Sequence, residues 1–132
     1  MNIPVLIANL LTFLAFIVHA FVGDKELKII EPSYEKDEKF IKQEKWTMAR
    51  SSWHWISFDL LFASIGLGVI NFTDYFEKEK QLLEILAIYF FGYGIAWLIG
   101  ITISKDFPMK FLKLGQWILL WVISGLIYWG IK

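Results

Sequence analysis

The sequence predicts an all-α, polytopic membrane protein, an antiparallel bundle of four transmembrane helices in a single domain. Apolar residues make up 57% of the 132 residues and aromatic residues 18%, which is more apolar surface than a small soluble domain can bury. Almost all of it is concentrated in four windows of about 20 residues, the helical length that crosses a bilayer core of about 30 Å. None of the windows alternates with the period of two that barrel strands require.

The four helices are expected over residues 3–22, 47–70, 82–103 and 111–131. No Lys or Arg precedes the first one and it stays apolar throughout, so we expect a mature helix rather than a signal peptide. The connections over 71–81 and 104–110 are short. The helices that they join should therefore form antiparallel hairpins.

The first loop, residues 23–46, is expected to be a charged cytoplasmic segment that carries both acidic and basic residues. Ser33 is a potential N-cap, and pairs such as Glu35–Lys39 have the favourable order for residues one helical turn apart. We therefore expect the second helix to extend into this loop from about residue 34. The extension is either a solvated connector, as charged helix faces usually are, or a docking surface for a membrane-complex partner.

The distribution of basic residues predicts the topology. Ten of the 13 lysines and arginines lie in or beside the first and third loops, and the other three are Lys78, Lys80 and Lys132. Basic loops stay on the cytoplasmic side, and acidic residues count little in this rule. The sequence thus predicts a multi-pass protein of a bacterial inner membrane, in contact with the lipid bilayer and with both termini outside.

Composition also excludes several classes of function. The net charge is zero, so no basic field is available to attract nucleic acid. The chain has no cysteine, which excludes disulfides, thiolate metal sites and cysteine nucleophiles. The sequence has no HExxH, no GxSxG and no glycine-rich phosphate loop, so no enzymatic activity is assigned.

Two histidines are expected to meet at one depth in the membrane. His19 lies four residues before Gly23, where the first helix ends, and His54 lies four residues after Arg50, where the second helix enters. Both imidazoles should therefore lie about 6 Å inside the cytoplasmic boundary. Either Asp24 or Glu26 could reach Arg50 at the rim. The expected members of this polar site are His19, His54, Arg50, Ser57, Trp53 and Asp24.

Four roles are open for this site. The two histidines are candidate axial ligands of a b-type haem, although helices that pack about 8–10 Å apart would have to splay to admit it. They equally suit a quinone headgroup or a proton relay, because imidazole titrates near neutral pH. Without cysteine they are an incomplete set for zinc, so no metal is expected. The structural alternative is a histidine pair, hydrogen-bonded with Ser57 and Arg50, that fixes the helix hairpin.

Two further features lie elsewhere in the helices. Asp59 is near the middle of the second helix and off the histidine face, which suggests a small proton-coupled transporter or a neutral carboxyl bonded to Tyr89 or Tyr93. The third helix carries four small residues at strict i+4 spacing: Gly92, Ala96, Gly100 and Ser104. Such a stripe predicts close packing between helices, either within the bundle, which we favour, or in a homo-oligomer.

The residues around the two histidines resemble a pattern in small, uncharacterised bacterial four-helix membrane proteins. In that family a first-helix His precedes Gly-Glu, as in His19-Ala-Phe-Val-Gly23-Asp24 here, and Arg-x-x-Trp-His opens the second helix, as in Arg50-Ser-Ser-Trp53-His54. This chain has Asp24 where Glu is usual. The resemblance covers about the first half of the chain and implies one constellation of His19, Arg50, Trp53 and His54. It implies no activity; a non-catalytic membrane subunit or scaffold is also consistent with it.

Overall fold

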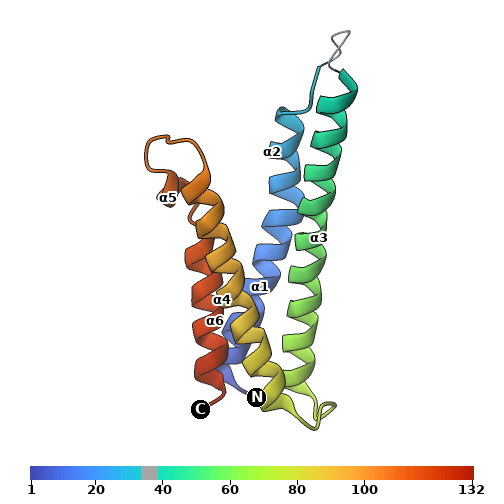
Figure 1. The fold of residues 1–132 in the computed structure, drawn as a ribbon. Coiled ribbons are helices and arrows are strands. Elements are labelled where there is room, and N and C mark those ends of the chain that lie inside the picture. Colours follow the sequence, from blue (N-terminus) through green and yellow to red (C-terminus); the bar gives the residue numbers. More distant parts are fainter. Residues whose placement is uncertain (34–38) are drawn as a thin grey trace. The chain divides into compact units, whose positions relative to one another are not determined.

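The computed structural model describes residues 1–33 and 39–132, and every regular element within these ranges is a helix (Figure 1). The elements are α1 (Ile3–Ile17), the π-helical turn η1 (Val18–Gly23), α2 (Asp24–Ile29), α3 (Lys39–Phe72), α4 (Glu79–Ile103), α5 (Lys110–Lys113) and α6 (Gln116–Gly130). The predicted all-α class is confirmed for this part of the chain.

Three helical stretches are long and apolar enough to cross a membrane: Ile3–Ile29, Phe40–Phe72 and Glu79–Ile103. The first is one continuous rod, because α1, η1 and α2 follow each other without a break. Residues 24–29, which were expected to belong to the first loop, are therefore helical. The predicted extension of the second helix is confirmed from Lys39 onward, whereas the expected cap at Ser33 and a start at 34 involve residues 34–38, outside the described ranges.

The fourth apolar window differs from the prediction of one helix over 111–131. It is divided into the short α5 and the 15-residue α6, which at about 1.5 Å per residue is roughly 22 Å long. The break falls at Leu114 and Gly115, neither of which has helical backbone angles. The Leu114 carbonyl, which is freed at this break, accepts the Trp97 Nε1–H at 3.0 Å, so the break is tied to α4.

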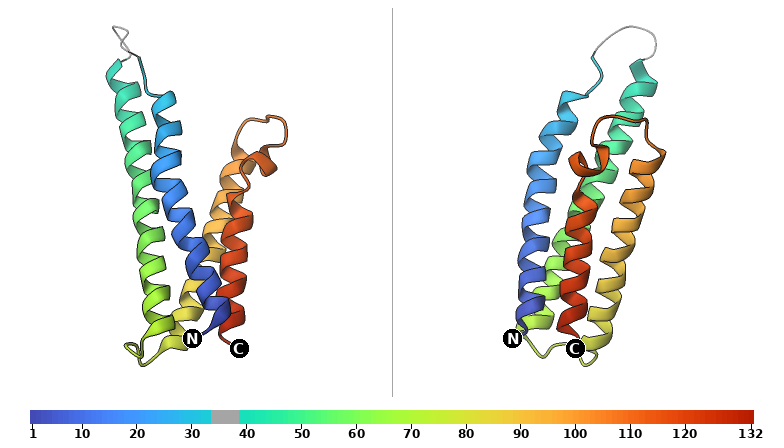
Figure 2. Two further views of the ribbon diagram at one scale, coloured as in Figure 1. Left: turned by 180° about the vertical axis from the view of Figure 1, so that it is seen from behind. Right: turned by 90° about the vertical axis from the view of Figure 1, so that its left-hand side faces the viewer.

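The chain consists of two compact units, one of residues 12–64 and the other of residues 1–11 and 65–132. In the first unit, the end of α1, η1 and α2 lie alongside the N-terminal part of α3 and run antiparallel to it (Figure 2). The Trp46 indole donates a hydrogen bond to the Leu27 carbonyl at 3.0 Å. This bond joins α3 to α2 near the loop.

In the other unit, α4 packs antiparallel on α6 (Figure 2). The buried residues of the two helices are Leu83, Ala87, Phe90, Gly94 and Ile101 of α4 and Ile123, Ser124 and Ile127 of α6. The Ser124 hydroxyl donates to the Ala87 carbonyl at 2.7 Å, which satisfies a buried polar group across the interface. The chain termini meet in this unit, since the Asn2 side-chain amide donates to the Gly130 carbonyl at 2.6 Å.

The stripe of small residues on α4 is not the face that packs on α6. Gly92, Ala96, Gly100 and Ser104 are all exposed, and a Cβ added to Gly92 or Gly100 would meet nothing within 4 Å. The stripe therefore does not mediate the contact of α4 with α6, and its expected role in other helix packing or in a homo-oligomer stays a prediction. The adjacent face carries Leu83 and Phe90, and burying these larger side chains gains more apolar contact than burying glycines does.

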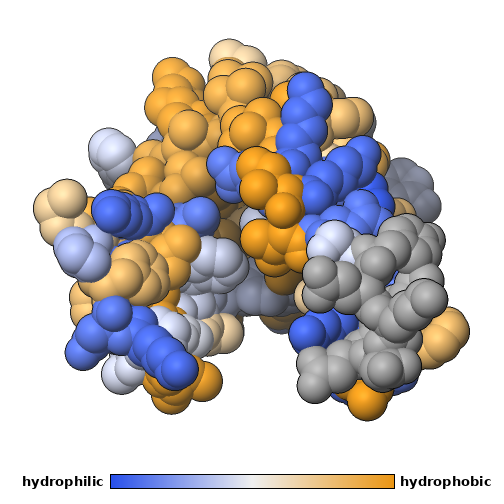
Figure 3. All heavy atoms as spheres, turned by 90° about the horizontal axis from the view of Figure 1, so that it is seen from above, coloured by the Kyte–Doolittle hydropathy of each residue, from blue (hydrophilic) through white to orange (hydrophobic). Residues whose placement is uncertain are grey.

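Many large apolar side chains point away from the helix contacts. Trp55, Phe58 and Phe62 of α3 are 64–70% exposed, and Figure 3 shows such apolar residues (orange) between patches of hydrophilic ones (blue). Apolar exposure on this scale is not expected of a monomeric soluble protein. Together with the three long apolar helices, it is the exterior expected of helices that face lipid.

Candidate functional site

All six residues of the expected polar site lie together in the unit of residues 12–64. Asp24 and His19 are on the rod formed by α1, η1 and α2, and Arg50, Trp53, His54 and Ser57 are on the facing side of α3. Their spacing on α3 places the four side chains within two helical turns on one face. We call these six residues the polar cluster.

Asp24 is the centre of the charged half of the polar cluster. The Arg50 guanidinium donates two hydrogen bonds to it, Nε to Oδ1 at 2.7 Å and Nη2 to Oδ2 at 2.9 Å. His54 Nε2 lies 3.2 Å from Oδ1 and Lys28 Nζ 3.5 Å from Oδ2. The Asp24 side chain is only 14% exposed. Of the two acids that could reach Arg50, Asp24 is thus the partner, and the two-pronged geometry is the stronger form of this pair.

Two members of this group were not expected from the sequence. Lys28 adds a second cation to Asp24, one helical turn along the same helix. Trp46 lies with its ring centroid 5.2 Å from the Arg50 guanidinium carbon, a cation–π contact that helps to hold the arginine side chain. Asp24 and Lys28 are one helical turn apart, and so are Trp46 and Arg50. This spacing is the feature of the sequence that could have indicated both contacts.

His19 is bound through one ring nitrogen. Its Nδ1 lies 2.9 Å from the Ser57 hydroxyl, and that hydroxyl also lies within hydrogen-bonding distance of the Trp53 carbonyl, at 3.3 Å. Since a hydroxyl has one proton, two arrangements fit these distances: Ser57 donates to Nδ1, or Ser57 donates to the Trp53 carbonyl and Nδ1 carries the hydrogen. In the second arrangement the other nitrogen of a neutral imidazole, Nε2, has an open lone pair. Within residues 1–33 and 39–132, no group hydrogen-bonds to Nε2.

Trp53 joins the two helices directly. Its indole is stacked on the His19 ring, and its Nε1–H donates to the His19 carbonyl at 2.8 Å. The wider turn of η1 accompanies this contact, and single π-helical turns inside α-helices often occur at functional sites. Gly23, the last residue of η1, is buried, and an added Cβ would collide with Trp53 Cζ2. Only glycine therefore lets the indole lie this close to the rod.

His54 has a different environment from His19. It lies one turn beyond Arg50 on α3, donates through Nε2 to Asp24, and its side chain is 47% exposed. The two imidazoles thus belong to one cluster, but each has its own partner. Ser57 holds His19, and Asp24 holds His54.

A b-type haem does not fit this arrangement. Bis-histidine ligation needs both imidazoles to address one iron from opposite faces of a porphyrin. Here the helices touch at the level of His19, through its hydrogen bond to Ser57 and the contact of Trp53 with Gly23. A macrocycle between them would have to displace these contacts. Nor do the described residues contain a group of three or more metal-ligating side chains.

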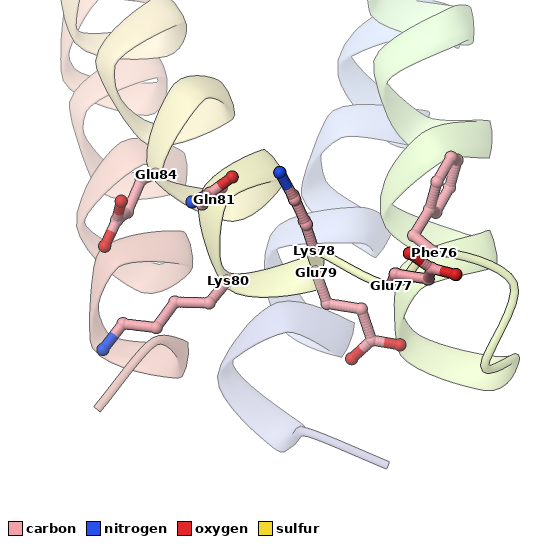
Figure 4. Close-up of a pocket in the computed structure, with 7 residues that line it drawn as sticks. All are labelled: Phe76, Glu77, Lys78, Glu79, Lys80, Gln81 and Glu84. Carbon is pink, nitrogen blue, oxygen red and sulfur yellow. The ribbon is translucent and has the colours of Figure 1, made fainter.

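Other expected features lie outside the polar cluster. Asp59 is on α3, partly buried, and takes no part in the hydrogen bonds of the polar cluster. A hollow at residues 76–81 and 84 carries several charges, but its side chains fan out from the chain and do not converge (Figure 4). The polar cluster is therefore the candidate site.

The chain matches no protein-family model, and no curated protein or solved structure is similar to it. The resemblance suggested by the His19 and Arg50–His54 patterns stays a prediction. Function is inferred from the chemistry of the polar cluster. The Asp24 half is saturated by internal bonds, whereas His19 Nε2, next to an aromatic surface, takes no hydrogen bond from the described residues.

Proposed function

We propose that this chain is an integral membrane protein of four helices whose polar cluster binds the hydroxylated aromatic headgroup of a membrane quinol. The three long apolar helices and the exposed apolar side chains support the membrane location. The ten-to-three distribution of basic residues supports a cytoplasmic position for the first and third loops. In that orientation the polar cluster lies near the cytoplasmic face, within reach of a headgroup in that leaflet.

The observation that carries this proposal is that no described residue hydrogen-bonds to His19 Nε2; we take Nδ1 to carry the hydrogen, which leaves Nε2 with a lone pair. A quinol presents O–H groups, and one of them can donate to this lone pair. In this tautomer the Ser57 hydroxyl accepts the Nδ1–H bond on the other side of the ring. The site is half-buried at the edge of an apolar helix, as suits a ligand with a polar head and an apolar tail.

The same geometry favours the reduced ligand over the oxidised one. A quinone offers only carbonyl oxygens, which accept hydrogen bonds and find no donor at Nε2. Binding a quinone would require His19 to be protonated or to change tautomer, and after a change of tautomer the Ser57 hydroxyl would donate to Nδ1 and give up its bond to the Trp53 carbonyl. We therefore expect the site to bind quinol rather than quinone, as a binding site and without an assigned electron transfer.

The test compares three ligands of one shape on the protein in lipid nanodiscs, by titration calorimetry. The ligands are a short-chain benzoquinol, its quinone and its dimethyl ether, which lacks the O–H donor. Quinol should bind about tenfold or more tightly than the ether, the value of one good hydrogen bond. Equal binding of quinol and ether would reject the proposal.

A variant of His19 separates binding from structure. In His19→Asn the side-chain amide can take the place of Nδ1–H toward Ser57, but no acceptor remains at the position of Nε2. We expect this variant to fold like the parent and to lose the preference for quinol. Trp129→Phe, a change of an exposed aromatic residue, is the control and should bind quinol unchanged. Retained preference in His19→Asn would show that His19 is not the acceptor.

A further inference from the structure

A shallow apolar groove follows α4 for much of its length on the side next to Trp121 of α6. One stripe of α4 residues at i+4 spacing lines it, Phe91, Ile95, Ile99 and Ile103, together with Thr102, and its volume is ≈ 480 Å³. The four α4 residues are 41–82% exposed. The Thr102 hydroxyl is already used, since it donates to the Leu98 carbonyl at 2.7 Å. The groove thus offers almost purely apolar contact.

Trp121 of α6 lines the groove beside Phe91. Its ring stacks on Phe91 with centroids 5.5 Å apart, and its Nε1–H donates to the Phe91 carbonyl at 3.2 Å. The indole lies flat on α4 because residue 94 is glycine, and a Cβ there would collide with it. This wall of the groove is therefore a fixed element of the α4–α6 contact.

The length of the groove matches one leaflet. From Phe91 to Ile103 the helix advances by 12 residues, or about 18 Å at about 1.5 Å per residue. Half of a hydrocarbon core of about 30 Å is roughly 15 Å. A groove that begins at the end of α4 thus reaches about as far as an acyl chain of that leaflet does.

The groove ends at Ile103, where the chain enters a basic connection. Ile103 is the last residue of α4, and Lys105, Lys110 and Lys113 follow it with one acid, Asp106. Lys110 folds back to the helix end, with Nζ 3.4 Å from the Ser104 carbonyl and 2.7 Å from Asp106. The hydrogen bond from Lys110 keeps the pKa of the Asp106 carboxyl below its usual value, so Asp106 stays charged. It offsets Lys110 and leaves the charges of Lys105 and Lys113.

We propose that this groove binds one acyl chain of an anionic phospholipid, whose phosphate is paired with Lys105 and Lys113. An apolar groove of one leaflet's depth, followed along the chain by two lysines that have no ion pair among the described residues, matches this ligand in shape and in charge. A neutral lipid would match the apolar groove but not the positive charge. The proposal rests on α4 crossing a membrane, as proposed above, but not on the polar cluster or its ligand.

Native mass spectrometry tests the proposal on the full chain, purified in detergent with equal amounts of phosphatidylglycerol and phosphatidylcholine. We expect one retained lipid, with phosphatidylglycerol favoured at least fivefold. Ile99→Trp fills the groove and should lose the bound lipid. Ile88→Trp makes the same change at an exposed position of α4 outside the groove and should keep it. The double variant Lys105→Gln/Lys113→Gln should retain one lipid but lose the preference for phosphatidylglycerol.

Three results would overturn the proposal. Ile99→Trp could retain the lipid as well as Ile88→Trp does, or the double lysine variant could keep the full preference. Alternatively, the parent chain could appear as a dimer that Ile99→Trp dissociates, in which case a second copy covers the groove. The membrane assignment is tested separately by sedimentation with membranes after carbonate extraction. Its failure would be seen in the parent chain and in every variant alike.

Discussion

The imidazole of His19 and the indole of Trp53 lie parallel, with centroids 3.9 Å apart and planes 8° apart, and the same indole donates to the His19 carbonyl. One residue of α3 therefore contacts both the side chain and the backbone of one residue on the facing rod. This pair joins two segments that are 34 residues apart in the chain. Removing the N–H group and removing the aromatic ring should therefore weaken the contact between the two helices by different amounts.

Trp53→Phe keeps an aromatic ring beside His19 but removes the N–H donor and the second ring of the indole. We expect it to lower the free energy of unfolding by at least about 1 kcal/mol, the net value of one hydrogen bond, because the lost ring also packs on Gly23. Trp53→Leu also removes the stacking and should cost about 1 kcal/mol more. The measurement is denaturant unfolding in detergent, followed by far-ultraviolet circular dichroism. If Phe and Leu gave the same loss, the stacking would contribute nothing.

Gly23→Ala should destabilise the protein by about 1–3 kcal/mol, the usual cost of forcing an extra group into a filled contact. Trp53 cannot move aside cheaply, because its stacking and its hydrogen bond hold it over Gly23. Gly92→Ala is the matched control, since the space around Gly92 is open. It should be neutral or stabilising by up to about 1 kcal/mol through helix propensity. Thermal unfolding of both variants side by side decides the point; equal stability would mean that Trp53 does not rest on Gly23.

Asp24→Asn should lower the midpoint of thermal unfolding clearly, because Arg50 loses its ionised partner and Lys28 and His54 lose a shared acceptor. Asp106→Asn makes the same chemical change in an ion pair whose aspartate is 94% exposed. The Lys110 side chain is 11% exposed, but an aspartate that stays in water contributes little to such a pair, so this variant should unfold close to the parent. The difference between the two midpoints isolates the effect of the polar cluster. If the unfolding midpoint of Asp24→Asn fell as little as that of Asp106→Asn, the Asp24–Arg50 pair would contribute no more to stability than a surface ion pair.

The helical fold was predictable because apolar windows of membrane length leave few alternatives in a chain this short. The details that differ depend on contacts that periodicity does not encode. The π-helical turn η1 accompanies the contact of Trp53 with Gly23, and the break before α6 coincides with the Leu114 carbonyl that accepts from Trp97. The small stripe on α4 does not face α6, because small residues permit close packing without requiring it. The contact with α6 is made by the neighbouring face of α4, where Ser124 binds Ala87 and Trp121 lies on Gly94.

The membership of the polar cluster was predictable from helix geometry, because two antiparallel helices with polar residues at matching distances from one boundary bring those residues together. The partners within it were not. Ser57 binds His19, whereas Asp24 binds both Arg50 and His54. Which partner each side chain takes depends on differences in position that are smaller than one helical turn. The haem hypothesis required the two helices to splay, and the contact of Trp53 with Gly23 holds them together.

The proposed topology has a direct test, because the chain has no cysteine and any introduced thiol is unique. Lys78→Cys, in the connection over residues 71–81, should react with a membrane-impermeant maleimide added to intact spheroplasts. Lys25→Cys and Lys105→Cys should react only after the membrane is opened, because basic segments stay on the cytoplasmic side. All three positions are exposed, so all three should react in detergent, which controls for reagent access. Labelling of Lys105→Cys from outside would mean that α4 does not cross the membrane in the proposed direction. The quinol site would then have to be reassigned to the opposite leaflet if Lys25→Cys were labelled as well.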